Sequence, residues 1–443
     1  MFASLRQTAL AIFQAGVAAA DPYLAVQRHL SVDDRGYLQI QLDDGCLLSR
    51  HWSSVQLLAV GKAACAMTKA AQEIIPASLL KNKALAITNY ENVVPLPAIR
   101  VLGARHPLPD AAGLAAAQLL AQELVNTRTG ELVLVLVSGG GSALIPYPVS
   151  GITLQEKILV TKCLLACGAP IHDINCVRKH LSQLKGGGLA RLAAPADVHA
   201  LILSDVLGDD LSVIASGITV ADDSTFAEAI NILKNRQIWL QIPKSVQSYL
   251  QAGSAGKVPE TPKANDSLFT HNSHTLIGSN RISVNAMMAT AEHCGYSPLL
   301  FSDNLSGEAR TVAEQIVLFA KTINQPTALL AGGETTVTLT GNGSGGRNQE
   351  MALAFAIAAQ QHQLNGNWVF LSGGTDGLDG PTPAAGGMVD PQTLQRMQQH
   401  TVNPVAMLAN NDSFHALQLS DDLLVTGATG TNVADLQILL IRP

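Results

Sequence analysis

The chain has 443 residues, of which 47% are hydrophobic, 14% are charged and 4% are aromatic. A single hydrophobic core rarely grows to this length, so we expect two domains, and low charge with many small apolar residues is typical of α/β enzymes whose strands are buried on both faces. The formal net charge of -6, without any basic run, argues against a nucleic-acid-binding protein.

Residues 1–20 combine Arg6 with an apolar stretch and a run of alanines, a pattern that imitates a secretory signal peptide. Polar residues interrupt the stretch, however, and its apolar residues recur with the period of a helix that buries one face. We therefore expect an amphipathic first helix. No apolar run elsewhere reaches the roughly 18 residues that a membrane-spanning helix needs, so no membrane partner is expected.

Strand-like apolar runs alternate with helical patterns throughout the first half of the chain. Residues 131–137 are the clearest buried strand, because they are rich in β-branched residues and show no polar alternation. Asp110 is a candidate N-cap, and Thr153 with Glu156 forms a capping box. The other expected elements are strands at 55–60, 84–88 and 200–203 and helices at 63–75, 110–125 and 153–167. This rhythm predicts a doubly wound, Rossmann-like parallel sheet that binds ligands at the carboxyl ends of its strands.

The periodic pattern is lost between residues 251 and 266, where Gly, Pro and charged residues gather. We therefore predict two α/β domains, residues 1–255 and residues 268–443. Residues 331–341 resemble a strand pair more than a parallel crossover, so the second sheet is expected to be mixed. The elements expected in the second domain are strands at 274–278, 297–301, 327–330, 335–340, 369–371 and 436–441 and helices at 281–293 and 308–322.

Three glycine-rich runs each follow an apolar, strand-like stretch. They are Ser138-Gly139-Gly140-Gly141-Ser142, residues 341–347 and residues 372–377. Glycine has no side chain to hold a ligand away, so the backbone N–H groups of such runs bind anions, and phosphates above all. One run alone is often only a tight turn, but three in one chain predict N–H groups gathered around a phosphate-bearing ligand.

Two charged residues stand at the ends of expected strands. Lys62 follows the strand at 55–60 and is placed to aim its ammonium group at phosphate oxygens, with a solvated surface lysine as the alternative. Its surroundings are not a P-loop, because Ala63 stands where that motif has Ser or Thr. Asp205 follows the strand at 200–203 and is a candidate to hold Mg²⁺ or to accept the proton of a substrate hydroxyl.

Arg347 is expected at a helix N-terminus, where its charge opposes the helix dipole, and this placement suggests a bound anion. Two other clusters stay open. Residues 178–180 with Lys185 are either anion contacts or cations at a helix C-terminus. Residues 375–380 are either two Asx turns or a carboxylate pair beside a metal or substrate.

Taken in order, these motifs resemble those of the class II glycerate 2-kinases, whose C-terminal half carries a MOFRL domain. The resemblance covers nearly the whole chain. Its motifs are His106–Asp110, residues 138–144, 175–182, 204–206 and 208–210 in the first half, and residues 333–335, 346–350, 375–377, 379–380 and 426–433 in the second. So many motifs in the same order make the resemblance specific.

The resemblance implies phosphorylation of D-glycerate at its C2 hydroxyl, with ATP and Mg²⁺, in a cleft between two α/β domains, the MOFRL region being about residues 325–443. Lys62, Asp205 and Arg347 stand at the catalytic positions, and Asp205 is the expected metal ligand. Arg347 is expected to pair with either the glycerate carboxylate or the transferred phosphoryl group. The expected nucleotide-binding residues are Ser138, Gly139, Gly140, Gly141, Ser142, Gly333, Glu334, Asn348 and Asp376.

Two other function classes are weighed against the kinase. An NAD(P)-dependent hydroxypyruvate reductase would need a Gly-x-Gly-x-x-Gly turn, but Leu144 stands at the third glycine position, and no acidic residue follows at the end of the next strand in convincing form. A non-catalytic nucleotide-binding protein would bind ATP without releasing ADP when glycerate is added. Several charged side chains are expected at strand ends, and this favours an enzyme over a non-catalytic binding protein.

The number and spacing of the cysteines indicate the redox state of the cellular compartment. The six cysteines include no Cys-x-x-Cys pair, and Cys163 and Cys167 lie four apart in an apolar helical pattern, so buried free thiols are favoured over metal ligands. This usage indicates a reducing cytoplasm. The expected partner is a small-molecule substrate, glycerate, with no nucleic acid and no membrane, and the oligomeric state, including a homo-oligomer, stays open.

Overall fold

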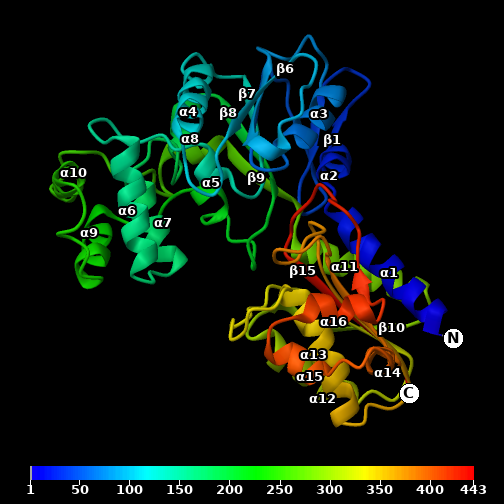
Figure 1. Cartoon of the computed structure of the whole chain (residues 1–443). Coiled ribbons are helices and arrows are strands. Elements are labelled where there is room, and N and C mark those ends of the chain that lie inside the picture. Colours follow the sequence, from blue (N-terminus) through cyan, green and yellow to red (C-terminus); the bar gives the residue numbers. More distant parts are fainter. Residues whose placement is uncertain (1) are drawn as a thin grey trace. The chain divides into compact units, whose positions relative to one another are not determined.

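The structure is a computed structural model that describes residues 2–443, with side chains described from Ser4 onward. It divides into two compact units. We call Pro22–Ile277 the N-unit, and the N-terminal stretch up to Asp21 together with Gly278–Pro443 the C-unit. Figure 1 labels the helices and strands of both units.

The N-unit is built on a six-stranded sheet with the order β6-β5-β4-β7-β8-β9. Its strands are β4 (Val55–Val60), β5 (Ala84–Asn89), β6 (Ile99–Ala104), β7 (Leu132–Val137), β8 (Asp197–Leu203) and β9 (Asn272–Gly278). The pairs from β6 to β8 are parallel. Counted along the chain this order is 3-2-1-4-5-6, which is typical of a doubly wound sheet. The predicted parallel sheet is therefore confirmed.

The helices of the N-unit cover this sheet and build a second core beside it. They are α2 (Pro22–His29), α3 (Ala64–Ile74), α4 (Ala111–Leu124), α5 (Gly141–Leu144), α6 (Leu154–Ala166), α7 (Ile171–His180), α8 (Gly188–Ala193), α9 (Phe226–Asn235) and α10 (Lys244–Ser254). Helices α6, α7, α9 and α10 share an apolar cluster around Phe226 and Leu250, apart from the sheet (Figure 1). A small antiparallel sheet is formed by β1 (Leu30–Val32), β2 (Leu38–Gln41) and β3 (Leu47–Ser49).

The C-unit has a mixed sheet with the order β10-β11-β15-β12-β13-β14. Its strands are β10 (Ser297–Leu305), β11 (Thr327–Gly333), β12 (Asn367–Gly374), β13 (Gly386–Val389), β14 (Leu423–Leu424) and β15 (Asp435–Arg442). Only the β10–β11 pair is parallel among the described strands of this unit. Its helices are α1 (Phe2–Ala19), α11 (Asn280–His293), α12 (Ala309–Ala320), α13 (Arg347–Gln361), α14 (Thr393–Gln399), α15 (Pro404–Ala409) and α16 (Ser413–Leu419).

The mixed sheet was predicted, but the reason given for it was wrong. Residues 335–340 form no strand, apart from one isolated bridge between Glu308 and Thr336. The backbone N–H groups of Thr340 and Gly341 instead donate to the side-chain oxygen of Asn411, at 2.8 and 2.9 Å. The sheet is mixed because the C-terminal strand β15 runs antiparallel between β11 and β12.

The division into units differs from the predicted domains at both ends of the N-unit. Helix α1 packs its apolar face, including Ile12 and Phe13, on the C-unit sheet, and Arg6 forms ion pairs with Asp390 at 2.7 Å and Asp422 at 2.9 Å. At the other end, β9 extends the N-unit sheet beside β8, so the irregular stretch at 255–266 lies inside the N-unit. Among the described helices none is by itself long and apolar enough to cross a membrane, although α1 and α2 together meet that test by length and composition alone.

Candidate functional site

The candidate site of the N-unit lies where the strand order changes direction, at the carboxyl ends of β4 and β7. In doubly wound sheets this switch point is where ligands bind. Two loops meet here. The N–H of Lys62 donates to the carbonyl oxygen of Gly139 at 2.9 Å, and the N–H of Ala63 donates to the Ser138 hydroxyl at 3.0 Å. Gly61 has a φ of +132°, and a Cβ there would lie 2.2 Å from Ser138 Oγ, so only glycine lets the loops approach this closely.

Asp205 reaches the same loop from the end of β8. A Cβ added to Gly139 would lie 2.1 Å from Asp205 Oδ2, which shows how closely the carboxylate lies against the loop backbone. Burial raises the pKa of Asp205, while its own backbone N–H and the charge of Lys62 lower it. Lys62 and Asp205, both predicted from the sequence, are therefore brought to one loop.

The loop at residues 138–142 keeps its N–H groups available. Gly140 adopts a left-handed conformation with a φ of +84° and begins the short helix α5. Within residues 2–443, no acceptor receives a hydrogen bond from the N–H groups of Gly139, Gly140, Gly141 or Ser142. This run fits the predicted phosphate-binding loop.

The run at residues 341–347 is different, because the fold takes up the N–H groups of its first four residues, and its role in anion binding stays a prediction. The N–H of Gly343 donates to the carbonyl oxygen of Asn410 at 2.9 Å, and the N–H of Ser344 donates to Asp412 Oδ1 at 3.0 Å. A Cβ at Gly341 would lie 2.3 Å from the Asn410 carbonyl oxygen. Gly341 and Gly343 are needed for packing against residues 410–412, and the N–H groups of residues 341–344 are already hydrogen bonded.

In the third run, at residues 372–377, the fold takes up the N–H groups of Gly374, Thr375 and Gly377. The run forms the end of β12, where Gly374 donates to the carbonyl oxygen of Ala385 at 2.8 Å and Thr375 to that of Ala434 at 3.0 Å. Asp376 accepts the N–H of Leu378 at 3.0 Å, which is the Asx-turn alternative. Asp376 remains only partly buried, so a ligand contact for it stays a prediction.

Asp379 caps helix α13 from outside it. Its carboxylate accepts the N–H groups of Asn348 at 3.2 Å and Gln349 at 2.8 Å, because Gly346, the N-cap residue, has no side chain to do so. A Cβ at Gly346 would lie 2.3 Å from Asp379 Cγ. Burial raises the pKa of Asp379 to about 6, although these N–H groups favour the charged form. Its hydrogen bonds account for Asp379 as a structural carboxylate.

Arg347, the first residue of α13, is held by two carboxylates. Asp435, which is fully buried, accepts from Arg347 Nε at 2.5 Å and from Nη2 at 2.9 Å. Glu334 pairs with Nη1 at 2.7 Å. Burial disfavours the charged guanidinium, but the hydrogen bonds and charge of Asp435 outweigh it and raise the pKa of Arg347. The unfavourable dipole that suggested a bound anion is thus compensated within the C-unit.

The remaining predicted nucleotide contacts of the C-unit have structural partners. Gly333 ends β11 with a φ of +154°, and a Cβ there would lie 2.2 Å from the carbonyl oxygen of Leu305. The N–H of Glu334 donates to the same oxygen at 2.8 Å. Asn348 is buried and accepts from the Ser372 hydroxyl at 2.6 Å. Nucleotide contacts at these three residues stay predictions that their surroundings do not require.

The basic cluster at residues 178–180 separates into structural and unpaired members. Lys179 pairs with the buried Asp222 at 3.2 Å, and His180 contacts Glu260 at 3.0 Å. Arg178 instead donates to the carbonyl oxygen of Ser142, in the glycine loop, at 3.3 Å. The alternative of anion contact therefore survives for Arg178 alone among the three.

Comparisons with known proteins agree with this architecture. The model described as "Domain of unknown function (DUF4147)" matches residues 8–251, and that of the MOFRL family matches residues 327–435. A glycerate 2-kinase of Pyrococcus horikoshii is 37% identical over 99% of this chain and 97% of its own length. The chain belongs to the class II glycerate 2-kinase family.

Further members of this family confirm the extent of the match. A D-glycerate 2-kinase of Thermotoga maritima is 37% identical over 99% of both chains, and a human glycerate kinase is 35% identical over 99% of this chain and 94% of its own. The crystal structure of the Thermotoga maritima glycerate kinase covers 99% of this chain with a TM-score of 0.87 and 36% identity. The crystal structure of a protein from Pyrococcus horikoshii gives a TM-score of 0.88 at 36% identity, covering 99% of this chain and 98% of its own.

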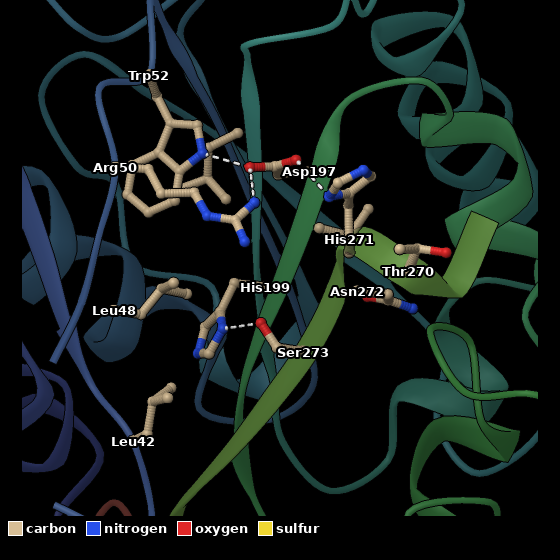
Figure 2. A pocket seen from close by; sticks show the side chains of 12 residues that line it. Leu42, Leu48, Arg50, Trp52, Asp197, His199, Thr270, His271, Asn272 and Ser273 are labelled. Carbon is tan, nitrogen blue, oxygen red and sulfur yellow. Dashed lines mark hydrogen bonds and ion pairs between the residues drawn. The ribbon is translucent and has the colours of Figure 1, made fainter. Parts of the chain in front are cut away.

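A pocket of the N-unit lies at the amino ends of the strands, opposite the carboxyl ends where the candidate site lies. It has a volume of about 120 Å³ and lies at the amino ends of β7 and β8. Figure 2 shows Asp197 between Trp52 and Arg50 on one side and His271 on the other, and Asp197 accepts from the Trp52 indole at 2.8 Å and from Arg50 at 3.1 Å. Its charged groups pair with one another, which favours a structural role.

Sequence reasoning missed two residues of the candidate regions. His106 lies against the loop, 3.1 Å from a Cβ added to Gly140, and burial followed by the charge of Lys62 lowers its pKa. Asp435 orients Arg347. His106 lies in one of the motifs of the resemblance, which could have drawn attention to it. Asp435 lies just beyond the motif at 426–433, and no local pattern marks a partner 88 residues from Arg347.

Proposed function

We propose that this protein is a glycerate 2-kinase, a phosphotransferase that moves the γ-phosphoryl group of ATP to the C2 hydroxyl of D-glycerate and releases 2-phosphoglycerate and ADP. One observation carries the proposal: the chain matches curated glycerate kinases over its whole length. The geometry of the N-unit supports it, because a lysine and a carboxylate meet a glycine loop with available N–H groups at the switch point of the sheet.

Phosphoryl transfer needs positioning and charge neutralisation more than covalent catalysis. The N–H groups of residues 139–142 bind phosphate oxygens of the nucleotide, and Lys62 stabilises the charge of the phosphoryl group in transit. Asp205 orients the C2 hydroxyl and accepts its proton. Its raised pKa suits this role, since a base that accepts a proton works best when its pKa approaches the working pH.

Magnesium is proposed as the companion of the nucleotide. Within the described part of the chain, no group of three or more His, Cys, Asp or Glu side chains is arranged to hold a metal ion. This fits Mg²⁺ bound with a nucleotide, which needs only one or two carboxylates besides phosphate oxygens and waters. Asp205 is the carboxylate that would hold it. When bound, Mg²⁺ neutralises phosphate charge.

Arg347 is proposed to act on an anionic oxygen of glycerate or of the phosphoryl group, as the sequence predicts. Asp435 fixes the plane of the guanidinium by its two hydrogen bonds, and the half-exposed Glu334 is the partner that an anion can replace. The predicted cleft that would bring Arg347 to Lys62 stays a prediction. We also propose a cytoplasmic location, consistent with six cysteines that all carry free thiols.

A coupled ADP-release assay with a panel of small hydroxy acids tests the proposal, with the phosphorylated position assigned by ³¹P and ¹³C NMR. We expect ADP release with D-glycerate and a phosphate on C2. No ADP release with D-glycerate, despite bound ATP, would favour a non-catalytic nucleotide-binding protein. A relative from Agrobacterium vitis, 39% identical, is provisionally named a hydroxypyruvate reductase, so hydroxypyruvate with NADH or NADPH forms the parallel arm. Oxidation of NADH or NADPH when hydroxypyruvate is added, without kinase activity, would contradict the proposal.

A further inference from the structure

Two buried lysines and a mostly buried arginine lie close together, and two of the three contact Ser142, the last residue of the glycine loop. Lys185 Nζ donates to the Ser142 carbonyl oxygen at 2.8 Å and to its hydroxyl at 2.9 Å, and Arg178 Nη2 donates to the same carbonyl at 3.3 Å. Lys157, on α6, donates to the carbonyl oxygen of Leu181 at 2.8 Å. Burial, and then the charge of Arg178, holds the pKa of both lysines well below its usual range. The three cations are therefore close enough to repel one another.

No carboxylate balances this charge. Within residues 4–443, none of Arg178, Lys157 and Lys185 forms an ion pair, and each donates only to backbone carbonyls or to a hydroxyl. The neighbouring Lys179 shows the usual arrangement, because it pairs with the buried Asp222. A buried cation without a counter-ion is costly. A ligand that supplies the missing negative charge would therefore explain why a mostly buried arginine, Arg178, lies beside the glycine loop.

A buried amide on the same helix has a donor that lacks an acceptor. Asn175 is buried, and among the described residues nothing accepts a hydrogen bond from its Nδ2. Its Oδ1 accepts from the Ser216 hydroxyl at 3.1 Å, and Ser216 in turn lies 2.6 Å from the Ser142 hydroxyl. Residues three apart on a helix share a face, so Asn175 and Arg178 present their donors on the same side of α7. The orphaned amide is an observation independent of the unpaired guanidinium.

The backbone that holds Ser216 in this network is unusual. Ala215 and Ser216 both adopt positive φ values, +49° and +57°, which residues other than glycine rarely do. Such conformations persist where the surrounding structure enforces them, and they gather at ligand sites.

We propose that Arg178 and Asn175 form an oxyanion subsite beside Ser142, which binds a carboxylate or phosphate oxygen of a reactant. The inference rests on the proposed kinase function and names further binding residues for it. The guanidinium donates from the nitrogens that Ser142 leaves free, and Asn175 donates from Nδ2. Lys185 holds the loop backbone in place. The carboxylate of D-glycerate and the phosphates of ATP offer the same chemistry, so the test separates them.

The test compares Arg178→Gln and Asn175→Asp with the wild type, with D-glycerate and ATP varied separately. We expect Arg178→Gln to raise the KM of one reactant about ten- to hundredfold, as for a lost charged hydrogen bond. A raised KM for D-glycerate identifies its carboxylate as the ligand, and a raised KM for ATP identifies a phosphate. Arg236→Gln is the matched control, since Arg236 pairs with Asp173 in the first turn of α7, and it should leave both KM values unchanged.

Asn175→Asp separates a binding role from a structural one. The new carboxylate keeps the acceptor for Ser216 but supplies Arg178 with an internal counter-ion, so the melting temperature should stay or rise while the same KM increases. Unchanged KM values for both reactants in both variants would overturn the proposal. If Arg178→Gln does not fold, Asn175→Asp decides.

If the wild type shows no turnover, the proposed function fails, and calorimetric titration of D-glycerate and of ADP decides the subsite by itself. Weaker binding of one of them to the variants supports it. Equal binding to wild type and variants, or no binding to the wild type, overturns it.

Discussion

The glycine loops of the two units make opposite use of the same composition. In the N-unit the N–H groups of residues 139–142 find no acceptor in residues 2–443, and Lys62 and Asp205 lie against the loop. In the C-unit the N–H groups of residues 341–344 donate to residues 410–412, and glycine is needed at positions 341 and 343 because that segment packs directly on them. A glycine run therefore indicates a ligand site only where the fold leaves its donors unused.

The largest expected effect comes from Lys62→Ala. Removing the ammonium group from the switch point should lower kcat by about 10²–10³-fold, the usual loss for one group that stabilises transition-state charge. Steady-state ADP release measures this, with circular dichroism to show that the fold is kept. Lys69→Ala is the control, since Lys69 is exposed on α3 and faces Glu73. A kcat near that of the wild type would remove Lys62 from the mechanism.

Asp205→Asn should lower kcat/KM by about 10²-fold or more, as for a lost general base. Because burial raises the pKa of Asp205 and the base must be ionised, wild-type kcat/KM should fall as the pH drops through that raised pKa. The variant should lose this acid limb, whereas the exposed Asp223→Asn should keep it. An acid limb of the same position in Asp205→Asn would assign the titration to another group.

A matched pair of glycine variants sharpens the comparison of the loops. Gly139→Ala places a methyl group on Asp205 Oδ2 and should lower kcat more than it lowers the melting temperature. Gly346→Ala places one on Asp379 Cγ and should destabilise the protein by about 1–3 kcal/mol, as overpacking does, with KM for ATP unchanged. Denaturant unfolding and kinetics on both variants measure the split. A loss of stability in Gly139→Ala, together with a loss of kcat in Gly346→Ala, would exchange the roles of the two loops.

The smallest effect concerns the pH dependence of stability at Asp379. Burial raises its folded-state pKa to about 6, above its ordinary value of 3.8, so protonation of Asp379 favours the folded state. Its contribution is complete below 3.8, is lost as the pH rises to about 6, and is constant above that. Asp379→Asn should flatten this part of the stability curve, on the order of 1–3 kcal/mol. An unchanged slope between wild type and variant would place the folded pKa near its ordinary value.

The sequence predicted what depends on neighbours along the chain. The strands at 55–60 and 131–137, the cap at Asp110 and the capping box at Thr153 all follow from local patterns, and the structure has them. Strand ends in a parallel sheet share one edge, so Lys62, Asp205 and the loop at 138–142 could be placed together before any coordinates.

The remaining features depend on partners far away in the chain, and no local pattern encodes them. The backbone N–H of Ser344 donates to Asp412, 68 residues away, and the charge of Arg347 is neutralised by Asp435, 88 residues away. Helix α1 reads as amphipathic, but its pattern does not say which sheet its apolar face covers. Residues 335–340 do not form the expected strand, because a distant side chain, Asn411, accepts hydrogen bonds from the backbone N–H groups of Thr340 and Gly341.

Amide hydrogen exchange measured with and without ATP and Mg²⁺ locates the phosphate-binding loop. We expect slower exchange at residues 139–142 when the nucleotide binds, with exchange at residues 341–344 unchanged. Protection confined to residues 341–344, with residues 139–142 exchanging as before, would contradict a phosphate site at residues 139–142.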